Sequence, residues 1–365
     1  MQLGDRVEDA LFLLLRAGLW NEAVVSNSVF PLNTMEWHHL FKLSHDHTIQ
    51  GVIFDGMASL PATHQAPKDL YIRWMVTVEK IALQNRKMNK VIAQQYVLFQ
   101  QQNISPILLK GQYLASFYPN PVRRVCGDVD WWFPNEEAFS IANTCMSGVG
   151  SAMVYPTATT ANYAYHGMEM DHHQRMIDAY NPFVQKYIDK LIRKELAQEN
   201  SISLDSVAVL VPSPLLGLVQ VNMHILKHLL SFGIGLRQLC DAAILYKRLA
   251  GTFQPKELLS VYKKIGVSRW IQVLHDILFR KLGIDSSYLP GFTPNHIDSD
   301  WMLREILQGG NFGFHDERYR EAETTGARMA TRSRVAKHIW QYLPYAPFEA
   351  LSFPIAHYID RFGKK

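Results

Sequence analysis

Residues 107–133 read ILLKGQYLASFYPNPVRRVCGDVDWWF, and this stretch decides the fold. It begins with a short apolar run, 107–109, and ends with a second, 129–133; such runs, bounded by glycine and proline, indicate buried strands. The first run stops at Lys110 and Gly111, where a helical pattern begins. A glycine at such a turn lets the backbone approach a ligand, and the amides that open a helix attract phosphate. Lys110 and Gly111 are therefore candidate phosphate-binding residues, with a purely structural turn as the alternative.

Two aspartates mark the start of the second apolar run. Asp128 and Asp130 are two positions apart, and such side chains on a strand share a face, roughly 6.6 Å apart along the chain. Two like charges beside an apolar strand repel each other and are expensive to bury unless a divalent cation neutralises them. Mg²⁺ suits this role because it takes oxygen ligands and completes its shell with water and substrate phosphates. The alternative is a strand end whose aspartates cap a turn.

A third carboxylate follows in residues 163–175, YAYHGMEMDHHQR. Glu169, Asp171 and His173 alternate with apolar or aromatic neighbours, so on a strand these three side chains share one face. We expect Asp171 to be the third metal ligand or a general base, with Glu169 as the second choice. The alternative is the solvated outer face of an edge strand.

The periodicity of apolar residues divides the chain into three parts. Residues 1–100 show helical spacing, and residues 101–182 carry short apolar runs punctuated by Gly, Pro and Asn, with one helical pattern among them. Helical spacing returns over 183–365. The predicted fold class is α+β, with a small mixed sheet flanked by helical N- and C-terminal segments.

Composition excludes several classes of protein. The chain has 365 residues, of which 48% are hydrophobic, and a net charge of +4, which argues against disorder and against a dedicated nucleic-acid binder. Its three cysteines form no CxxC pair, so we expect neither a disulfide framework nor a thiolate metal site. No apolar run reaches the roughly 20 residues of a membrane span, and no secretory signal is visible. We expect a cytoplasmic protein whose partner is an anionic small molecule.

The order of these motifs resembles a known family. Leu-Lys-Gly at 109–111, Arg-x-x-x-Gly-Asp-Val-Asp at 123–130 and an acidic strand ending in Asp-His-His at 171–173 are similar to the nucleotidyltransferase superfamily, and most closely to a bacterial family of uncharacterised nucleotidyltransferases. The later blocks at 224–228 and 235–241 also resemble that family. This chain departs from the pattern at Gly111-Gln112, where Gly-Gly or Gly-Ser is usual, and at Trp131-Trp132, where aliphatic residues are commoner.

The resemblance implies an activity and a set of site residues. Asp128, Asp130 and Asp171 would bind Mg²⁺, or Mn²⁺ in its place, and Asp171 would complete the site or deprotonate an acceptor hydroxyl. The implied reaction transfers a nucleoside monophosphate from a nucleoside triphosphate to that hydroxyl and releases pyrophosphate; such transfer depends mainly on positioning and charge neutralisation. The implied phosphate-binding residues are Lys110, Gly111, Arg123, Arg124 and His173. One of the two arginines is expected to be a surface residue only, and the modest charge argues against a long nucleic acid as acceptor.

Two other functions stay open at this point. Asp171-His172-His173 also spells the short motif of the DHH phosphoesterases, which are manganese enzymes. Nucleotidyltransferase folds also include catalytically inactive nucleotide-binding or antitoxin-like modules. Hydrolysis of a phosphodiester, transfer of a nucleotide, or binding without turnover would distinguish the three.

Four further patterns have ordinary interpretations beside functional ones. His224 and His228 lie one helical turn apart, the spacing of some zinc pairs, but no HExxH glutamate and no obvious third ligand lie nearby in the sequence, which favours a cleft or core position. Arg237 and Asp241 have the spacing of a helix ion pair or would border the pocket. Residues 309–313, GGNFG, match no phosphate-binding fingerprint and are interpreted as a loop. A basic stripe is interpreted as a solvated helix face and comprises Lys186, Lys190, Arg193 and Lys194.

Overall fold

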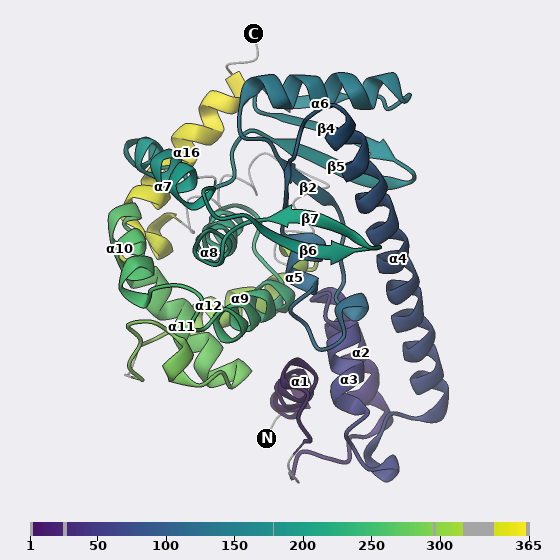
Figure 1. Cartoon of the computed structure of the whole chain (residues 1–365). Coiled ribbons are helices and arrows are strands. Elements are labelled where there is room, and N and C mark those ends of the chain that lie inside the picture. Colours follow the sequence, from purple (N-terminus) through teal and green to yellow (C-terminus); the bar gives the residue numbers. More distant parts are fainter. Residues whose placement is uncertain (1–2, 25–27, 178, 295–296, 317–338, 363–365) are drawn as a thin grey trace.

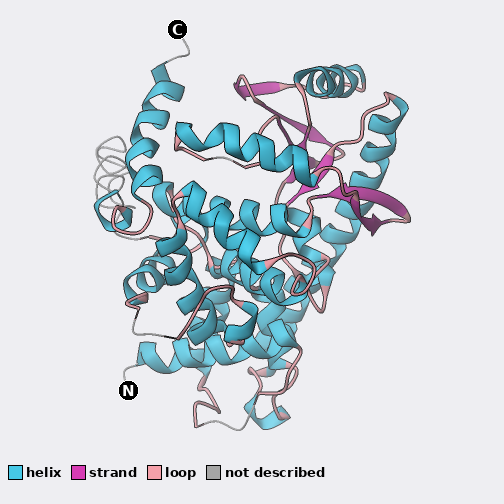
Figure 2. Cartoon of the chain, turned by 60° about the vertical axis from the view of Figure 1, so that its left-hand side comes forward, coloured by secondary structure: helices cyan, strands magenta, loops and turns pink. Residues whose placement is uncertain are grey.

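The computed structural model describes residues 3–24, 28–177, 179–294, 297–316 and 339–362 (Figure 1). Residues 317–338 and 363–365 of the expected C-terminal segment lie outside this part. The fold is α+β, as predicted: the strands gather at one end of the molecule and helices form the remainder (Figure 2). Among the described residues, no helix combines the length and the apolar character that crossing a membrane requires.

The sheet at the centre of the chain has five strands and is mixed. Its strands are β1 (Ile107–Leu109), β2 (Val129–Trp132), β3 (Val154–Thr157), β4 (Thr160–Tyr165) and β5 (Met168–His173). Their spatial order is β1-β2-β5-β4-β3, with β2 and β5 parallel and the other neighbours antiparallel. Two short helices accompany them, α5 (Gly111–Ala115) and α6 (Glu136–Gly148). The parallel pair β2 and β5 brings the two predicted acidic segments side by side.

Aromatic packing on the long helix α4 (Lys68–Gln101) fixes one face of the sheet. Trp131 of β2 is fully buried, stacks on Tyr96 at a centroid distance of 5.8 Å, and meets the edge of Phe99 at the same distance. Its indole nitrogen donates to Gln95 Oε1 at 2.5 Å, so its polar atom is satisfied. Because successive strand residues alternate between faces, this packing turns Asp130 toward the opposite side.

In the described part of the chain before α4 lie the α-helices α1 (Leu3–Trp20), α2 (Thr34–Asp46) and α3 (Gln50–Met57) and the 3₁₀ helix η1 (Ala62–His64). Helices α1 and α3 cross with their backbones in contact. A Cβ on Gly18 would lie 1.9 Å from the Val52 carbonyl oxygen, and one on Gly56 would lie 2.0 Å from that of Leu14. Glycine is therefore required at this crossing because no side chain fits between the two backbones.

The part after residue 183 is helical, with one element that the sequence analysis did not anticipate. Its helices are α7 (Gln185–Glu195), α8 (Pro214–Ser231), α9 (Leu236–Arg248), α10 (Pro255–Ile265), α11 (Ser268–Leu282), α12 (Asp300–Gly309) and α16 (Pro347–Phe362). The unexpected element is the antiparallel hairpin β6 (Asn200–Leu204) and β7 (Val207–Val211), whose second strand packs beside β1. Helices α8 and α9 pack together and supply the wall that faces the sheet.

Candidate functional site

The acidic centre of the site is a pair of aspartates on neighbouring parallel strands. Asp130 of β2 and Asp171 of β5 are direct partners in the strand register, so their side chains leave the sheet on the same face. His173, two residues further along β5, shares that face. One ligand atom from each of these three residues lies within 4.8 Å of the other two, and no other such group of three was found among the described residues. The alternation predicted for the acidic segment is therefore confirmed.

Asp128 lies directly before β2 and lines the same pocket, although it is outside the group of three. The negative charge of Asp130 and burial raise the pKa of Asp128 above its usual value. Glu169, the second choice for the third carboxylate, is exposed and does not line the pocket. The structure thus places Asp128, Asp130 and Asp171 around one space and leaves Glu169 outside it.

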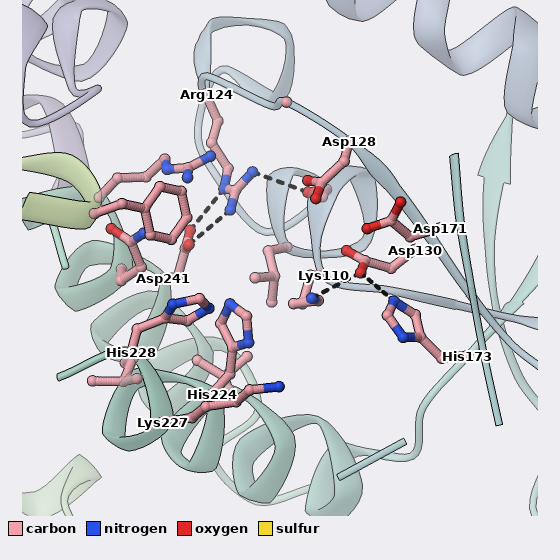
Figure 3. Close-up of a pocket in the computed structure, with 18 residues that line it drawn as sticks. Lys110, Arg124, Asp128, Asp130, Asp171, His173, His224, Lys227, His228 and Asp241 are labelled. Atoms are coloured by element: carbon pink, nitrogen blue, oxygen red, sulfur yellow. Dashed lines mark hydrogen bonds and ion pairs between the residues drawn. The ribbon is translucent and has the colours of Figure 1, made fainter. Parts of the chain in front are cut away.

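The turn after β1 carries Lys110 into the acidic centre. Lys110 follows Leu109, whose register partner is Asp130, and it adopts a φ of 45°, which is unfavourable for a residue with a side chain. Its ammonium Nζ lies 2.8 Å from Asp130 Oδ1, and His173 Nε2 lies 2.9 Å from the same oxygen (Figure 3). The strained turn therefore places a cation beside the carboxylates.

These neighbours separate the acidities of the two paired aspartates. Burial opposes ionisation of Asp130, but the Lys110 charge and the hydrogen bond from His173 outweigh it and lower the pKa of Asp130. Burial and the charges of Asp130 and Asp128 raise the pKa of Asp171 to about 6. Asp130 is thus held ionised, whereas the pKa of Asp171 is raised toward neutral pH. Two carboxylates with such different pKa values can take different roles.

A pocket of about 240 Å³ lies between this acidic centre and helices α8 and α9. His224, Lys227 and His228 of α8 lie across the pocket from Asp130 and Asp171 (Figure 3). Burial, followed by the charge of Lys110, lowers the pKa of His224 well below its usual value. The pocket therefore has an acidic wall on the sheet and a wall of nitrogen-bearing side chains on the helices.

Arg124 braces the pocket through a buried ion pair. Its Nε and Nη2 each lie 2.7 Å from an oxygen of Asp241, both side chains are only 4% exposed, and the Tyr118 hydroxyl donates to the same carboxylate. Arg124 Nη1 also donates to the Gly111 carbonyl oxygen at 3.2 Å. The guanidinium thus joins α9 to the Lys110-Gly111 turn.

The ordinary interpretation of Arg237 and Asp241 as a helix ion pair is wrong. Asp241 pairs with Arg124, which precedes it by 117 residues, and Arg237 Nη1 donates instead to the Val125 carbonyl oxygen at 2.6 Å. Both residues border the pocket, which was the functional alternative. The i, i+4 spacing misled because a buried bidentate partner from another segment binds the carboxylate.

The structure keeps Arg123 out of the pocket. Its guanidinium pairs with Asp55 of α3 and Glu79 of α4, so it joins the sheet unit to the N-terminal helices. All four residues of the basic stripe on α7 are exposed, and none lines the pocket. His172 points away from the acidic centre into the core, where Tyr163 Oη lies 2.6 Å from its Nε2 and Asn143 Oδ1 lies 2.7 Å from its Nδ1.

Several pocket residues escaped the sequence analysis, and three of them are polar or aromatic: Lys227, Gln238 and Phe312. Lys227 and Gln238 lie within the helical blocks at 224–228 and 235–241 and could have been found by following the pocket-facing side of each helix. Phe312 lies in the glycine-containing segment that was interpreted as a loop. No local pattern identifies it, because its position depends on contacts with residues that are distant in sequence.

Comparison with known proteins identifies the family to which this chain belongs. A family model described as uncharacterised nucleotidyltransferase matches residues 33–277. No curated protein matches the sequence. The crystal structure of an antigenic nucleotidyltransferase-like protein from Paracoccidioides brasiliensis is similar with a TM-score of 0.34 and 15% sequence identity, over 56% of this chain and 95% of that chain. Because the family match spans more than half of the chain and includes the acidic centre together with α8 and α9, this protein belongs to the uncharacterised nucleotidyltransferase family.

Proposed function

We propose that this protein transfers a nucleoside monophosphate from a nucleoside triphosphate to a hydroxyl group. The acceptor oxygen forms a bond to the α-phosphorus, the bond from that phosphorus to the bridging oxygen breaks, and pyrophosphate leaves. The observation that carries the proposal is the convergence of Asp128, Asp130 and Asp171 on one pocket whose helical wall includes the cationic side chains Lys227 and Arg237. Membership in a nucleotidyltransferase family supports the same reaction class.

The donor set of the acidic centre fits a divalent cation with oxygen ligands. Asp130 and Asp171 are register partners with ligand atoms within 4.8 Å. The negative charge of Asp130 also raises the pKa of Asp128, and a cation would relieve this repulsion. We propose that Asp128, Asp130 and Asp171 hold Mg²⁺, which Mn²⁺ can replace. When bound, the ion would neutralise charge on the phosphate oxygens.

The remaining roles follow from the positions of the side chains. Asp171 would complete the cation site or accept the proton of the acceptor hydroxyl, because its carboxylate faces the pocket beside Asp130. Lys110 provides a fixed positive charge beside Asp130, and Arg237 provides another on the opposite wall. Arg124 acts as a positioning residue because its guanidinium is engaged by Asp241 and orients the Gly111 turn.

The alternatives are less well supported by the geometry. In a DHH phosphoesterase the Asp-His-His triplet is the motif, but here His172 lies in the core on the other face of β5 from Asp171. An inactive module that has lost its site would lack a carboxylate, whereas all three line the pocket here.

A thermal-shift panel of the four nucleoside triphosphates with Mg²⁺ tests binding. A ligand at about 100 times its dissociation constant stabilises the native state by roughly 2.7 kcal/mol. We expect wild-type protein to show this shift, Asp128→Ala to lose most of it, and the matched control Glu169→Ala to keep it. Equal shifts in Asp128→Ala and wild type would remove Asp128 from the site.

Transfer itself is tested with a triphosphate labelled at the α-phosphorus, a small-molecule extract as the source of acceptors, and a parallel measurement of pyrophosphate. We expect label in a new product together with an equivalent amount of pyrophosphate, and neither with Asp130→Asn. Release of labelled monophosphate from a phosphodiester substrate with Mn²⁺, without nucleotide transfer, would instead favour a phosphoesterase.

A further inference from the structure

The glycine-containing segment 309–313 contributes an aromatic side chain to the pocket; it comprises the last residue of α12, Gly310 and the short 3₁₀ helix Asn311–Gly313, called the loop below. Phe312 of this loop lines the same space as Asp130 and Asp171, although nearly 140 residues separate it from β5. The loop also lies beyond residues 33–277, which match the family. Its contribution to the pocket is therefore not accounted for by the family match.

The backbone at Phe312 is strained, and in this conformation its side chain lines the pocket. Phe312 has φ 52° and ψ 24°, the left-handed conformation that costs a residue with a side chain about 1 kcal/mol or more. Such strain persists only where the surrounding structure imposes it. The structure does impose it here, because the loop is fixed at both ends.

Contacts on either side of Phe312 hold the loop against α2 and α9. Asn311 Oδ1 accepts a hydrogen bond from Gln238 Nε2 at 3.2 Å. After Phe312, the Nδ1 of His315 lies 3.3 Å from Asp46 Oδ1. A Cβ added to Gly310 would lie 3.0 Å from the Asp46 carbonyl oxygen and 2.8 Å from the His315 ring, so this position is closely packed. A side chain held from both sides is well suited to act as a rigid wall.

Phe312 belongs to a row of rings that begins beside the phosphate-binding side of the pocket and continues to the exposed Phe314, whose ring centroid is 6.3 Å from that of Phe312. His224 and His228 have ring centroids 4.3 Å apart, and His228 and Phe312 have centroids 4.9 Å apart. His224 also lines a smaller recess that it shares with Lys110 and Arg175. The row therefore leads from the cations nearest the acidic centre to a hydrophobic ring at the other end.

We propose that Phe312 and His228 form the surface on which the base of the nucleoside triphosphate stacks, with its phosphates toward Lys110 and the carboxylates. This inference rests on the proposed function and adds the binding site of the base. Gln238, the neighbouring amide, is already engaged by Gly235 and Asn311. Recognition therefore depends on stacking and tolerates different bases, because every base presents a π-face.

The test compares two kinds of anion, one with a nucleoside and one without. Calorimetric Kd values are measured with Mg²⁺ for the four nucleoside triphosphates and for inorganic tripolyphosphate. Stacking on an aromatic residue accounts for roughly a 5- to 150-fold effect per base, so Phe312→Ala should raise the Kd of the nucleotides by that factor. Its Kd for tripolyphosphate should not change, which also shows that the variant is folded. Phe312→Tyr should bind nucleotides like wild type.

Phe183→Ala is the matched control, because Phe183 is 88% exposed and does not line the pocket. It should leave every Kd unchanged. The inference is overturned if Phe312→Ala binds nucleotides as tightly as wild type, or if it loses nucleotide and tripolyphosphate affinity equally. Failure of the wild type to bind either anion overturns the proposed function as well.

Discussion

Replacing Asp241 by leucine is expected to destabilise the protein by about 3–5 kcal/mol. The magnitude follows from the burial of the pair: the Arg124 and Asp241 side chains are each 4% exposed, and Asp241 accepts hydrogen bonds from two Arg124 nitrogens and from the Tyr118 hydroxyl, all at 2.7 Å. Removing the carboxylate leaves a guanidinium in the interior without its counter-charge. The cost is therefore that of an uncompensated buried charge, well above the 0–1 kcal/mol of a surface pair.

A double-mutant cycle separates this electrostatic cost from the loss of packing. Arg124→Met should cost a similar amount, because it leaves the Asp241 carboxylate buried without its partner. The double variant Arg124→Met/Asp241→Leu removes both charges, so it should be destabilised by much less than the sum of the single variants.

Urea unfolding followed by circular dichroism measures the three variants against wild type, with the slope checked for constancy. A cost below about 1 kcal/mol for Asp241→Leu, or strict additivity in the double variant, would refute the reasoning. The double variant also loses the hydrogen bond from Arg124 to the Gly111 carbonyl. We therefore expect it to remain folded while binding Mg²⁺-nucleotide more weakly than wild type.

Two predictions concern stability alone. Gly56→Ala should destabilise the protein by about 1–3 kcal/mol in urea unfolding, because the added Cβ would lie 2.0 Å from a carbonyl oxygen of α1. The control Gly148→Ala should not destabilise it, because a Cβ at Gly148 meets open space. Equal effects of the two substitutions would contradict the close contact between α1 and α3. Burial lowers the pKa of His275 to about 3, against 6.5 in the unfolded chain, so the unfolded state takes up the proton first as the pH falls below about 6.5. This site should cost about 2 kcal/mol of stability at pH 5, and His275→Leu should remove that loss; identical pH profiles of the two proteins would disprove it.

The local pattern of the chain predicts the acidic centre well. Successive strand residues alternate between the two faces of a sheet, so the sequence alone predicts which face of β2 Asp130 occupies and which face of β5 Asp171 occupies. The bracketing apolar residues, such as Trp131 and Met170, indicate which face is buried. The pairing of the two strands is what the structure adds.

Other features depend on contacts between distant segments, which no local pattern reveals. The partner of Asp241 is Arg124 rather than Arg237, because packing of α9 against the β1 turn brings the first two together. Phe312 reaches the pocket only because Gln238 and Asp46 hold its loop. In both cases the decisive interaction joins residues more than 70 positions apart.

The hairpin β6–β7 is a different kind of omission, because its signal is local. Apolar residues alternate with serine along β6, and β7 is apolar throughout. Asp205 and Ser206 between the strands adopt φ values of 47° and 69°. A two-residue connection of this kind is typical of a tight hairpin turn. Helical patterns on both sides of the segment concealed it.

Calorimetric titration of a nucleoside triphosphate into the wild-type protein, in excess Mg²⁺ and again in EDTA, tests the central claim most directly. If Asp128, Asp130 and Asp171 hold the cation that binds the phosphates, affinity in EDTA falls by at least about tenfold, or 1.4 kcal/mol. Asp130→Asn should show no difference between the two conditions, and Glu169→Gln should behave like wild type. Equal affinity of the wild type with and without Mg²⁺ would contradict the account.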